Sequence, residues 1–301
     1  MPSRAGRVGD GVLFAAIMTA WGFNYLFVRA GLGFWEPLWL AAGRSTLGLV
    51  IVAGVALALP SIRGRLSWAG RRDALLLGLP NTGLFFGLWF SAAGSVLPGE
   101  AAVVVYTFPL WVALLGQPFL GHRWTPLTLG AVALGFAGVI LITEPWRVAG
   151  TALPLVAVAE LLAGSVSWAV GTVWFQKRFR GPEMQEANLY QLLGGSVALL
   201  GAAAVLEPGL PPPTGPVVPI LLWLGVVGTA GAYMAWFALL GRTRAATLSA
   251  YTFLVPVVAL SASIVLLGER LEFVQVAGVV AVLVSIYGTG RGAQPLEEPP
   301  G

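Results

Sequence analysis

The sequence consists of apolar runs of about twenty residues, separated by short polar connections. A helix of about 20 residues, rising ~1.5 Å per residue, spans the ~30 Å hydrocarbon core of a bilayer. Hydrophobic residues make up 57% of the 301 residues and charged residues 10%, whereas roughly 25% of the residues in soluble domains are charged. The chain is therefore predicted to be an all-α integral membrane protein that crosses the bilayer several times.

Proline and glycine residues divide the apolar sequence into ten predicted transmembrane helices, because these residues favour turns over helix interiors. The predicted helices cover residues 10–30, 37–58, 73–94, 98–119, 126–144, 152–176, 186–206, 217–240, 245–266 and 272–289. Residues 1–9 form a short basic segment without a small-residue cleavage site after it, so the first helix is expected to be retained. Residues 290–301 are polar and rich in proline, and are predicted to be a disordered tail.

The distribution of Lys and Arg predicts how the chain is oriented. If the N-terminus is cytoplasmic, 13 of the 17 basic residues fall on the cytoplasmic side. Three fall outside, at Arg29, Arg147 and Arg270, and Arg44 lies within a predicted helix. Because cytoplasmic loops collect Lys and Arg, both termini are predicted to be cytoplasmic.

The two halves of the chain resemble each other at an offset of 147 residues. Rare residue types coincide at this offset: Trp21 with Trp168, Gly48 with Gly195, Gly78 with Gly225, Thr82 with Thr229, Trp89 with Trp236, and Gly121 with Gly268. At an offset of 145, Tyr106-Thr107-Phe108 also matches Tyr251-Thr252-Phe253. These matches predict two five-helix repeats, residues 10–147 and 148–289. An odd number of helices per repeat makes the second repeat enter the membrane in the opposite sense, as in many secondary transporters.

Several short motifs resemble a known family. They are Trp21-Gly22-Phe23-Asn24 with Arg29, Pro37 and Arg44, then Pro109 with Gly121, and finally Ala245-Ala246, Pro256 and Leu267-Gly268-Glu269-Arg270-Leu271. Together they resemble the EamA domains of the drug/metabolite transporter superfamily. The resemblance implies an exporter of amino acids or drugs, and within the family an aromatic amino acid exporter is most similar. His122 departs from the pattern, since the first EamA copy often has an acidic residue like Glu269 there.

Polar and aromatic residues of the predicted helices could line a central cavity. On the first helix, Trp21, Asn24 and Tyr25 follow the i, i+3, i+4 spacing and share one face. Phe85 lies on the corresponding face of the third helix. The candidate cavity residues are Trp21, Asn24, Tyr25, Arg44, Asn81, Thr82, Trp89, Tyr106, Glu160, Trp168, Gln191, Tyr233, Trp236 and Tyr251. Aromatic walls with a few polar groups are typical of small-molecule sites. The alternative is that the aromatics pack or face lipid and that the amides hold helices together.

Arg44 and Glu160 each lie about eight residues into a helix that starts outside, roughly 12 Å below the surface. A charge at this depth is costly unless it is paired or hydrated. The two side chains are therefore candidates for an ion pair; otherwise Arg44 bonds helix-end carbonyls and Glu160 faces a water-filled mouth. Pro109 and Pro256 are predicted to kink the fourth and ninth helices, either as a gate or as part of the bundle's shape. Gly83 and Gly87 form a GxxxG motif that predicts close helix packing.

The residue types present favour transport over catalysis. The chain contains no Cys and one His, and it shows no nucleophile with a base, metal cluster or paired carboxylates that an enzyme would need. It also lacks a Walker A motif for ATP. We expect no cofactor, no metal and no nucleic acid partner. A channel or structural assembly protein remains the alternative to a carrier.

The expected protein is thus a multi-pass carrier of the bacterial inner membrane. Its partners would be the lipid bilayer and a small-molecule substrate, and a monomer is compatible with the sequence. The expected substrates are zwitterionic or cationic amphiphilic metabolites, with amino acids first, carried outward by alternating access between the repeats.

Overall fold

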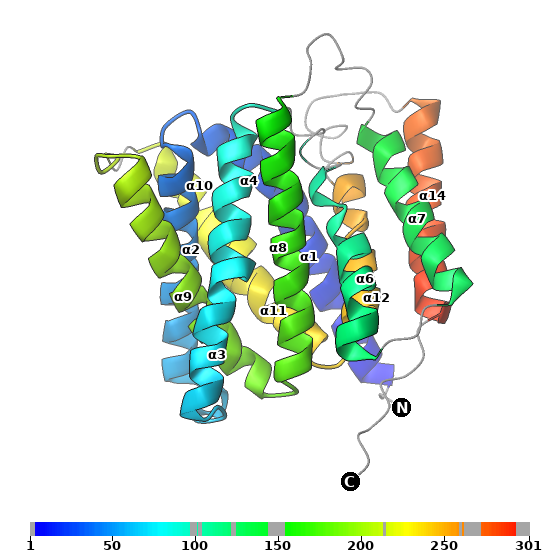
Figure 1. The fold of residues 1–301 in the computed structure, drawn as a ribbon, viewed down its shortest axis with the longest axis horizontal. Coiled ribbons are helices and arrows are strands. Elements are labelled where there is room, and N and C mark those ends of the chain that lie inside the picture. Colours follow the sequence, from blue (N-terminus) through cyan, green and yellow to red (C-terminus); the bar gives the residue numbers. More distant parts are fainter. Residues whose placement is uncertain are drawn as a thin grey trace.

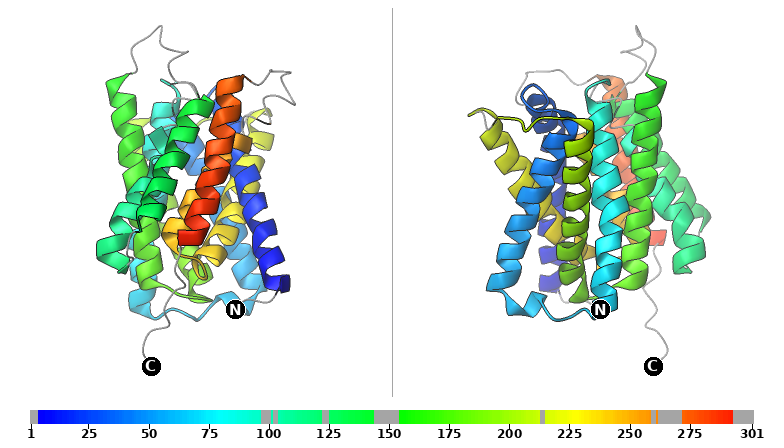
Figure 2. Two further views of the ribbon diagram at one scale, coloured as in Figure 1. Left: turned by 90° about the vertical axis from the view of Figure 1, so that its right-hand side faces the viewer. Right: turned by 60° about the vertical axis from the view of Figure 1, so that its left-hand side comes forward.

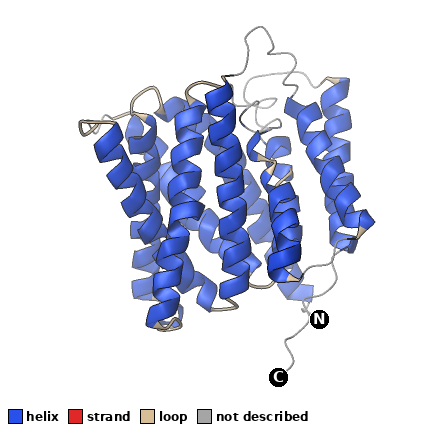
Figure 3. Cartoon of the chain, in the orientation of Figure 1, coloured by secondary structure: helices blue, strands red, loops and turns tan. Residues whose placement is uncertain are grey.

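The computed structural model describes residues 4–96, 101, 104–121, 125–143, 154–212, 215–258, 261 and 272–292. The regular structure of this part of the chain is helical (Figure 3). The helices lie side by side in one bundle whose two ends carry the connections (Figure 1). His122, Glu269, Arg147 and Arg270 lie outside the described residues, as does most of the predicted tail.

The first half of the chain contains α1 (Arg4–Gly31), α2 (Pro37–Ala58), the short η1 (Pro60–Ile62), α3 (Trp68–Gly78), η2 (Leu79–Leu84), α4 (Phe85–Ala93), α6 (Phe108–Leu120) and α7 (Pro126–Thr143). The second half contains α8 (Leu155–Arg178), α9 (Glu183–Leu206), α10 (Val217–Leu222), η4 (Trp223–Gly231), α11 (Ala232–Leu240), α12 (Ala245–Tyr251) and α14 (Phe273–Gly292).

Six helical stretches are long and apolar enough to cross a membrane. They are Gly9–Gly31, Pro37–Ala58, Trp68–Ala93, Leu155–Arg178, Glu183–Leu206 and Val217–Leu240. Shorter apolar helices, at Phe108–Leu120, Pro126–Ile142, Ala245–Val258 and Phe273–Ser285, overlap the four remaining predicted segments. Large apolar side chains such as Val50, Val197 and Leu283 cover the outer surface of the bundle. An apolar exterior of this kind belongs against lipid tails.

The third predicted helix begins at Trp68, not at residue 73. The Ser67 hydroxyl accepts a hydrogen bond from the Gly70 N–H at 3.2 Å and caps the helix. A serine at this position satisfies one of the free N–H groups of the first turn. Arg71 and Arg72 therefore belong to the start of α3 and not to a loop.

Each half contains a π-helical stretch in its third long helix. The stretch η2 ends at Leu84 and η4 ends at Gly231, which are 147 residues apart. In η4 the Thr229 hydroxyl donates to the Leu224 carbonyl at 2.8 Å. Stretches of π-helix are rare and frequently occur at functional sites, so the two wide turns mark equivalent points of the two halves.

The fourth and ninth predicted helices are interrupted instead of kinked. α6 begins at Phe108 after a turn at Tyr106-Thr107, and α12 ends at Tyr251 before a turn at Thr252-Phe253. Pro109 and Pro256 follow these breaks closely. Pro109 lies in the first turn of α6, where a missing N–H does little harm. The Val105 carbonyl, four residues earlier, instead accepts a hydrogen bond from the Ser165 hydroxyl of α8 at 3.2 Å.

Glycines bring the backbones of the two halves into close contact. A Cβ added at Gly78 would lie 2.2 Å from the Gln191 carbonyl oxygen of α9. The Gly83–Gly87 motif also faces α9, since a Cβ at Gly83 would lie 3.3 Å from Ala198, which confirms the predicted close packing. α7 and α14 pack against each other at one side of the bundle (Figures 1 and 2).

Three ion pairs between different segments of the described residues lie at one end of the bundle, and they show how the helices are directed. They join Asp10 to Arg242 at 2.9 Å, Asp73 to Arg178 at 2.6 Å, and Glu186 to Arg71 at 3.0 Å. We call this the basic end; it carries Arg63, Arg65, Arg71, Arg72, Lys177, Arg178, Arg180, Arg242 and Arg244. α1 starts here and α8 ends here, so these equivalent helices run in opposite directions (Figure 1).

At the opposite end of the bundle, an acidic side chain caps the N-terminus of α2. The Glu207 carboxylate, at the end of α9, accepts hydrogen bonds from the Leu38 N–H at 3.0 Å and the Trp39 N–H at 3.1 Å. A carboxylate is favourable at a helix N-terminus because of the free N–H groups and the helix dipole. The contact joins the start of α2 in the first half to the end of α9 in the second.

Candidate functional site

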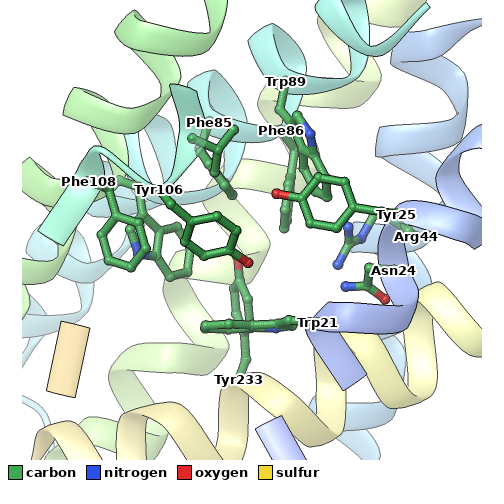
Figure 4. A pocket seen from close by; sticks show the side chains of 12 residues that line it. Trp21, Asn24, Tyr25, Arg44, Phe85, Phe86, Trp89, Tyr106, Phe108 and Tyr233 are labelled. Atoms are coloured by element: carbon green, nitrogen blue, oxygen red, sulfur yellow. The ribbon is translucent and has the colours of Figure 1, made fainter. Parts of the chain in front are cut away.

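A small cavity lies in the middle of the bundle, between side chains of both halves (Figure 4). Its walls come mainly from α1, α4, α8 and the turn before α6. The lining residues are Trp21, Asn24, Tyr25, Arg44, Phe85, Phe86, Trp89, Val105, Tyr106, Phe108, Trp168 and Tyr233. The cavity volume is about 50 Å³, far below the roughly 300–1,000 Å³ of small-molecule pockets. A metabolite would therefore enter only after these side chains move apart.

Aromatic rings from equivalent positions meet at this cavity. Trp21 and Trp168 contact each other edge to face, with ring centroids 6.0 Å apart. Trp168 also packs against Phe85 at 4.9 Å and Tyr233 at 5.5 Å. Rings in such contacts contribute attraction beyond the area that they bury. The two tryptophans that coincide at the 147-residue offset thus contact each other at the boundary of the halves.

Two tyrosine hydroxyls supply polar atoms within the aromatic wall. Tyr25 and Tyr106 are both among the residues that line the cavity. Both rings project into the cavity from opposite sides (Figure 4). Tyr106 lies in the turn where the fourth predicted helix is broken, so the break places this side chain at the site.

Arg44 is the cationic residue of the cavity wall, and it is only 1% exposed. Its Nε donates to the Thr229 hydroxyl at 3.1 Å, and its Nη2 donates to the Gly228 carbonyl at 3.2 Å. The guanidinium carbon lies 4.2 Å from the centre of the Phe86 ring. The remaining nitrogen, Nη1, has no hydrogen-bond partner.

Arg44 and Glu160, the candidates for an ion pair, are not paired with each other. Arg44 instead turns toward η4, which packs against α2. Glu160 is half-buried on α8 and does not line the cavity. Similar depth in the membrane does not bring two side chains together when their helices present different faces to each other.

The hydrogen bond of Arg44 has an equivalent in the other half. Gln191, which occupies the matching position on α9, accepts a hydrogen bond from the Thr82 hydroxyl at 2.7 Å. Thr82 in turn matches Thr229 at the 147-residue offset. The second long helix of each half thus bonds to the π-helical stretch of the other half. In the Arg44 contact the first half supplies the long helix and the second half the π-helical stretch, and in the Gln191 contact these roles are reversed.

Three of the predicted cavity residues hold helices together instead of lining the cavity. Asn81 and Thr82 of η2 both donate to the Gln191 side chain, and Gln191 donates to Asn188 at 3.0 Å. Trp236 contacts Trp21, with ring centroids 5.3 Å apart, and is not among the lining residues. Tyr251 packs against Phe14 at 5.2 Å and is not among the lining residues.

Eight of the candidates do meet at the cavity: Trp21, Asn24, Tyr25, Arg44, Trp89, Tyr106, Trp168 and Tyr233. Sequence reasoning did not single out Phe86, Val105 or Phe108 as lining residues. Phe86 could have been found, because it matches Tyr233 at the 147-residue offset and the two rings stack at 6.1 Å. No local pattern marks Val105, which reaches the cavity through the helix break.

Comparisons with known proteins agree with this architecture. The model of the EamA-like transporter family matches residues 10–144 and again residues 155–291. A probable amino-acid metabolite efflux pump of Salmonella typhimurium is 29% identical over 92% of this chain and 93% of its own length. The uncharacterized inner membrane transporter YedA of Escherichia coli is 29% identical over 93% of this chain and 90% of its own. A solved crystal structure shares the fold with a TM-score of 0.75 at 18% identity, covering 93% of this chain and 96% of that one.

The repeated family match, the apolar spans and the inner membrane relatives agree on what kind of protein this is. It is a multi-pass protein of the bacterial inner membrane, and its partners are the lipid bilayer and a small-molecule substrate. The chain belongs to the EamA-like transporter family.

Proposed function

We propose that this protein is a carrier that exports amino acids, aromatic and large neutral ones first, through the cavity between its two halves. The observation that carries the proposal is the small aromatic cavity with a buried cation at the boundary of the halves. Apolar and aromatic walls with a few polar groups are the usual composition of a small-molecule site. The relatives named as probable amino-acid metabolite efflux pumps support the substrate class and the outward direction.

The two corresponding contacts between the halves support an alternating-access mechanism. Equivalent helices run in opposite directions, and equivalent bonds join Arg44 to Thr229 and Gln191 to Thr82. Two inverted repeats can rock around a central site and open it first to one side and then to the other. The π-helical stretches end next to the lining residues Phe85 and Tyr233, and the break of the fourth helix places Tyr106 in the wall; these are points where the bending would occur.

The residue types of the cavity wall also restrict which classes of substrate it can bind. The walls offer aromatic faces for an apolar side chain, and Arg44 is the cation among the lining residues. Phosphorylated sugars and nucleotides would need several cations. The resemblance to the aromatic amino acid exporter YddG favours tryptophan, phenylalanine and tyrosine as first candidates.

Uptake into proteoliposomes tests the proposal. Purified protein should give saturable uptake of labelled tryptophan and phenylalanine, and unlabelled aromatic amino acids should compete. A nucleotide sugar and glutamate serve as negative controls in the same vesicles. Robust flux of the nucleotide sugar, together with no flux of amino acids, would contradict the substrate class.

The orientation in the membrane gives a second prediction. The basic end of the bundle should face the cytoplasm, with ten spans and both termini inside, because cytoplasmic loops collect Lys and Arg. The chain has no Cys, so a single introduced cysteine is the one site that a maleimide can label. Leu210→Cys, where Leu210 is 82% exposed at the far end, should react with an impermeant maleimide in intact cells. Arg180→Cys should react only after permeabilisation, and the reverse pattern would refute the orientation.

A further inference from the structure

Arg44 is a buried cation whose hydrogen-bonding capacity is not filled. Its side chain is 1% exposed, and Nη1 has no partner although Nε and Nη2 both have one. The described partners of Arg44 are a hydroxyl, a backbone carbonyl and aromatic rings, none of which carries a negative charge. A cation removed from water without a counter-ion is unfavourable. Its presence in the wall of a cavity therefore points to an anionic group that arrives with a ligand.

The neutral partners of Arg44 fix the direction of its free nitrogen. Thr229 and the Gly228 carbonyl hold one edge of the guanidinium, and Phe86 covers one face. Figure 4 shows the guanidinium and the Asn24 side chain next to each other on one wall, with Phe86 and Trp89 on the same side and Tyr106 across from them. The amide nitrogen of Asn24 is directed toward this same space (Figure 4). N–H donors from two neighbouring side chains can bind the two oxygens of a carboxylate.

In the second half of the protein, a neutral side chain makes the corresponding contact between a long helix and a π-helical stretch. Gln191 stands at the position equivalent to Arg44 and accepts a hydrogen bond from the Thr82 hydroxyl at 2.7 Å, whereas Arg44 donates to Thr229. A neutral amide is thus sufficient to join the second long helix to the π-helical stretch of the other half. The positive charge of Arg44 is not required for such a contact. The charge is therefore available to bind a ligand.

We propose that Arg44, assisted by Asn24, binds the carboxylate of the transported molecule. The substrates would then be organic monocarboxylates with a large apolar or aromatic body, of which aromatic amino acids are the leading class. This inference rests on the proposed transport function and adds the recognised group. Amphiphilic amines without a carboxylate should bind weakly, although the aromatic walls would accept their rings.

The test compares ligands that differ only in the carboxylate. In proteoliposomes, tryptophan and tryptophanamide compete with labelled tryptophan for the wild-type protein and for Arg44→Gln, which copies the residue of the second half. For the wild type, tryptophan should compete at least about tenfold better than the amide, since a charge-assisted bond of ~1.4 kcal/mol gives that factor. Arg44→Gln should lose most of this preference, whereas the end variant Arg180→Gln should keep it. Arg44→Lys should retain part of it.

The outcomes separate this inference from the proposed function. If the wild type transports tryptophan but does not prefer it over the amide, carboxylate recognition is wrong and the transport function stands. The same conclusion follows if Arg44→Gln keeps the full preference. If the wild type transports no amino acid, the proposed function itself fails. Should Arg44→Gln not fold, the wild-type preference and the Arg44→Lys variant still decide the question.

Discussion

Replacing Gly78 by alanine is expected to reduce sharply the amount of folded protein that can be extracted from membranes. The new Cβ would lie 2.2 Å from the Gln191 carbonyl oxygen and 2.6 Å from the Gly195 backbone nitrogen. Both atoms belong to the backbone of α9, so no side chain can rotate away. Forcing extra volume into a packed core costs about 1–3 kcal/mol or more. The separation of the helices would also break the Thr82–Gln191 bond.

The measurement is size-exclusion chromatography of a fluorescent fusion in detergent, with thermal unfolding of whatever protein elutes as a single peak. Gly54→Ala is the matched control, because Gly54 lies in a long membrane helix and a Cβ there meets no atom within 4 Å. We expect the control to behave like the wild type. If Gly78→Ala elutes and unfolds like Gly54→Ala, the close backbone contact between the halves is not as described.

Replacing Trp168 by alanine is expected to lower tryptophan flux at least about tenfold per folded molecule, because a lost contact of ~1.4 kcal/mol gives that factor in affinity. Trp168 is in ring contact with five aromatic side chains: the lining residues Trp21, Phe85, Phe108 and Tyr233, and Trp236 outside the lining. Its loss removes a wall of the cavity, and cavity formation also destabilises the fold by roughly 3–5 kcal/mol. The flux must therefore be normalised to folded protein.

Two further variants separate a role in binding from a role in packing. Trp174→Ala changes the same residue type on the same helix at an outward position, which is 44% exposed, and should leave flux near the wild-type value. Trp168→Phe keeps an apolar ring and should fold, while the apparent affinity for tryptophan changes relative to leucine. Unchanged affinities for both amino acids in Trp168→Phe would show that this ring only packs.

The central position of the tryptophans was predictable from the sequence. Trp21 and Trp168 coincide at the repeat offset, and rare residues coincide by chance much less often than Leu, Val or Ala. Periodicity then placed Asn24 and Tyr25 on the same face as Trp21, and all three line the cavity. The repeat relation supplied the information that a single helix lacks.

The partners of the polar residues could not be predicted in the same way. Helical periodicity tells which residues share a face, but not which helix lies opposite that face. Arg44 therefore bonds to Thr229 across the boundary of the halves and not to Glu160 at similar depth. Gln191 likewise bonds to Thr82 and leaves the cavity to the aromatic residues.

The breaks in the fourth and ninth helices show another limit of local patterns. Pro109 marks the region, because the residue before a proline avoids helical geometry and the proline itself has no N–H. The break nevertheless falls earlier, at Tyr106-Thr107. The Ser165 side chain of α8 is bonded both to the Thr107 hydroxyl at 2.8 Å and to the Val105 carbonyl. This long-range contact cannot be read from the sequence around Pro109.

Counterflow tests most directly whether one cavity opens alternately to the two sides of the membrane. Proteoliposomes are loaded with unlabelled tryptophan and diluted into buffer with a trace of labelled tryptophan. A carrier exchanges one for the other, so the label should accumulate transiently above its equilibrium level and then decline. Labelled tryptophan that enters without such an overshoot, at a rate independent of the internal tryptophan, would indicate a channel and contradict alternating access.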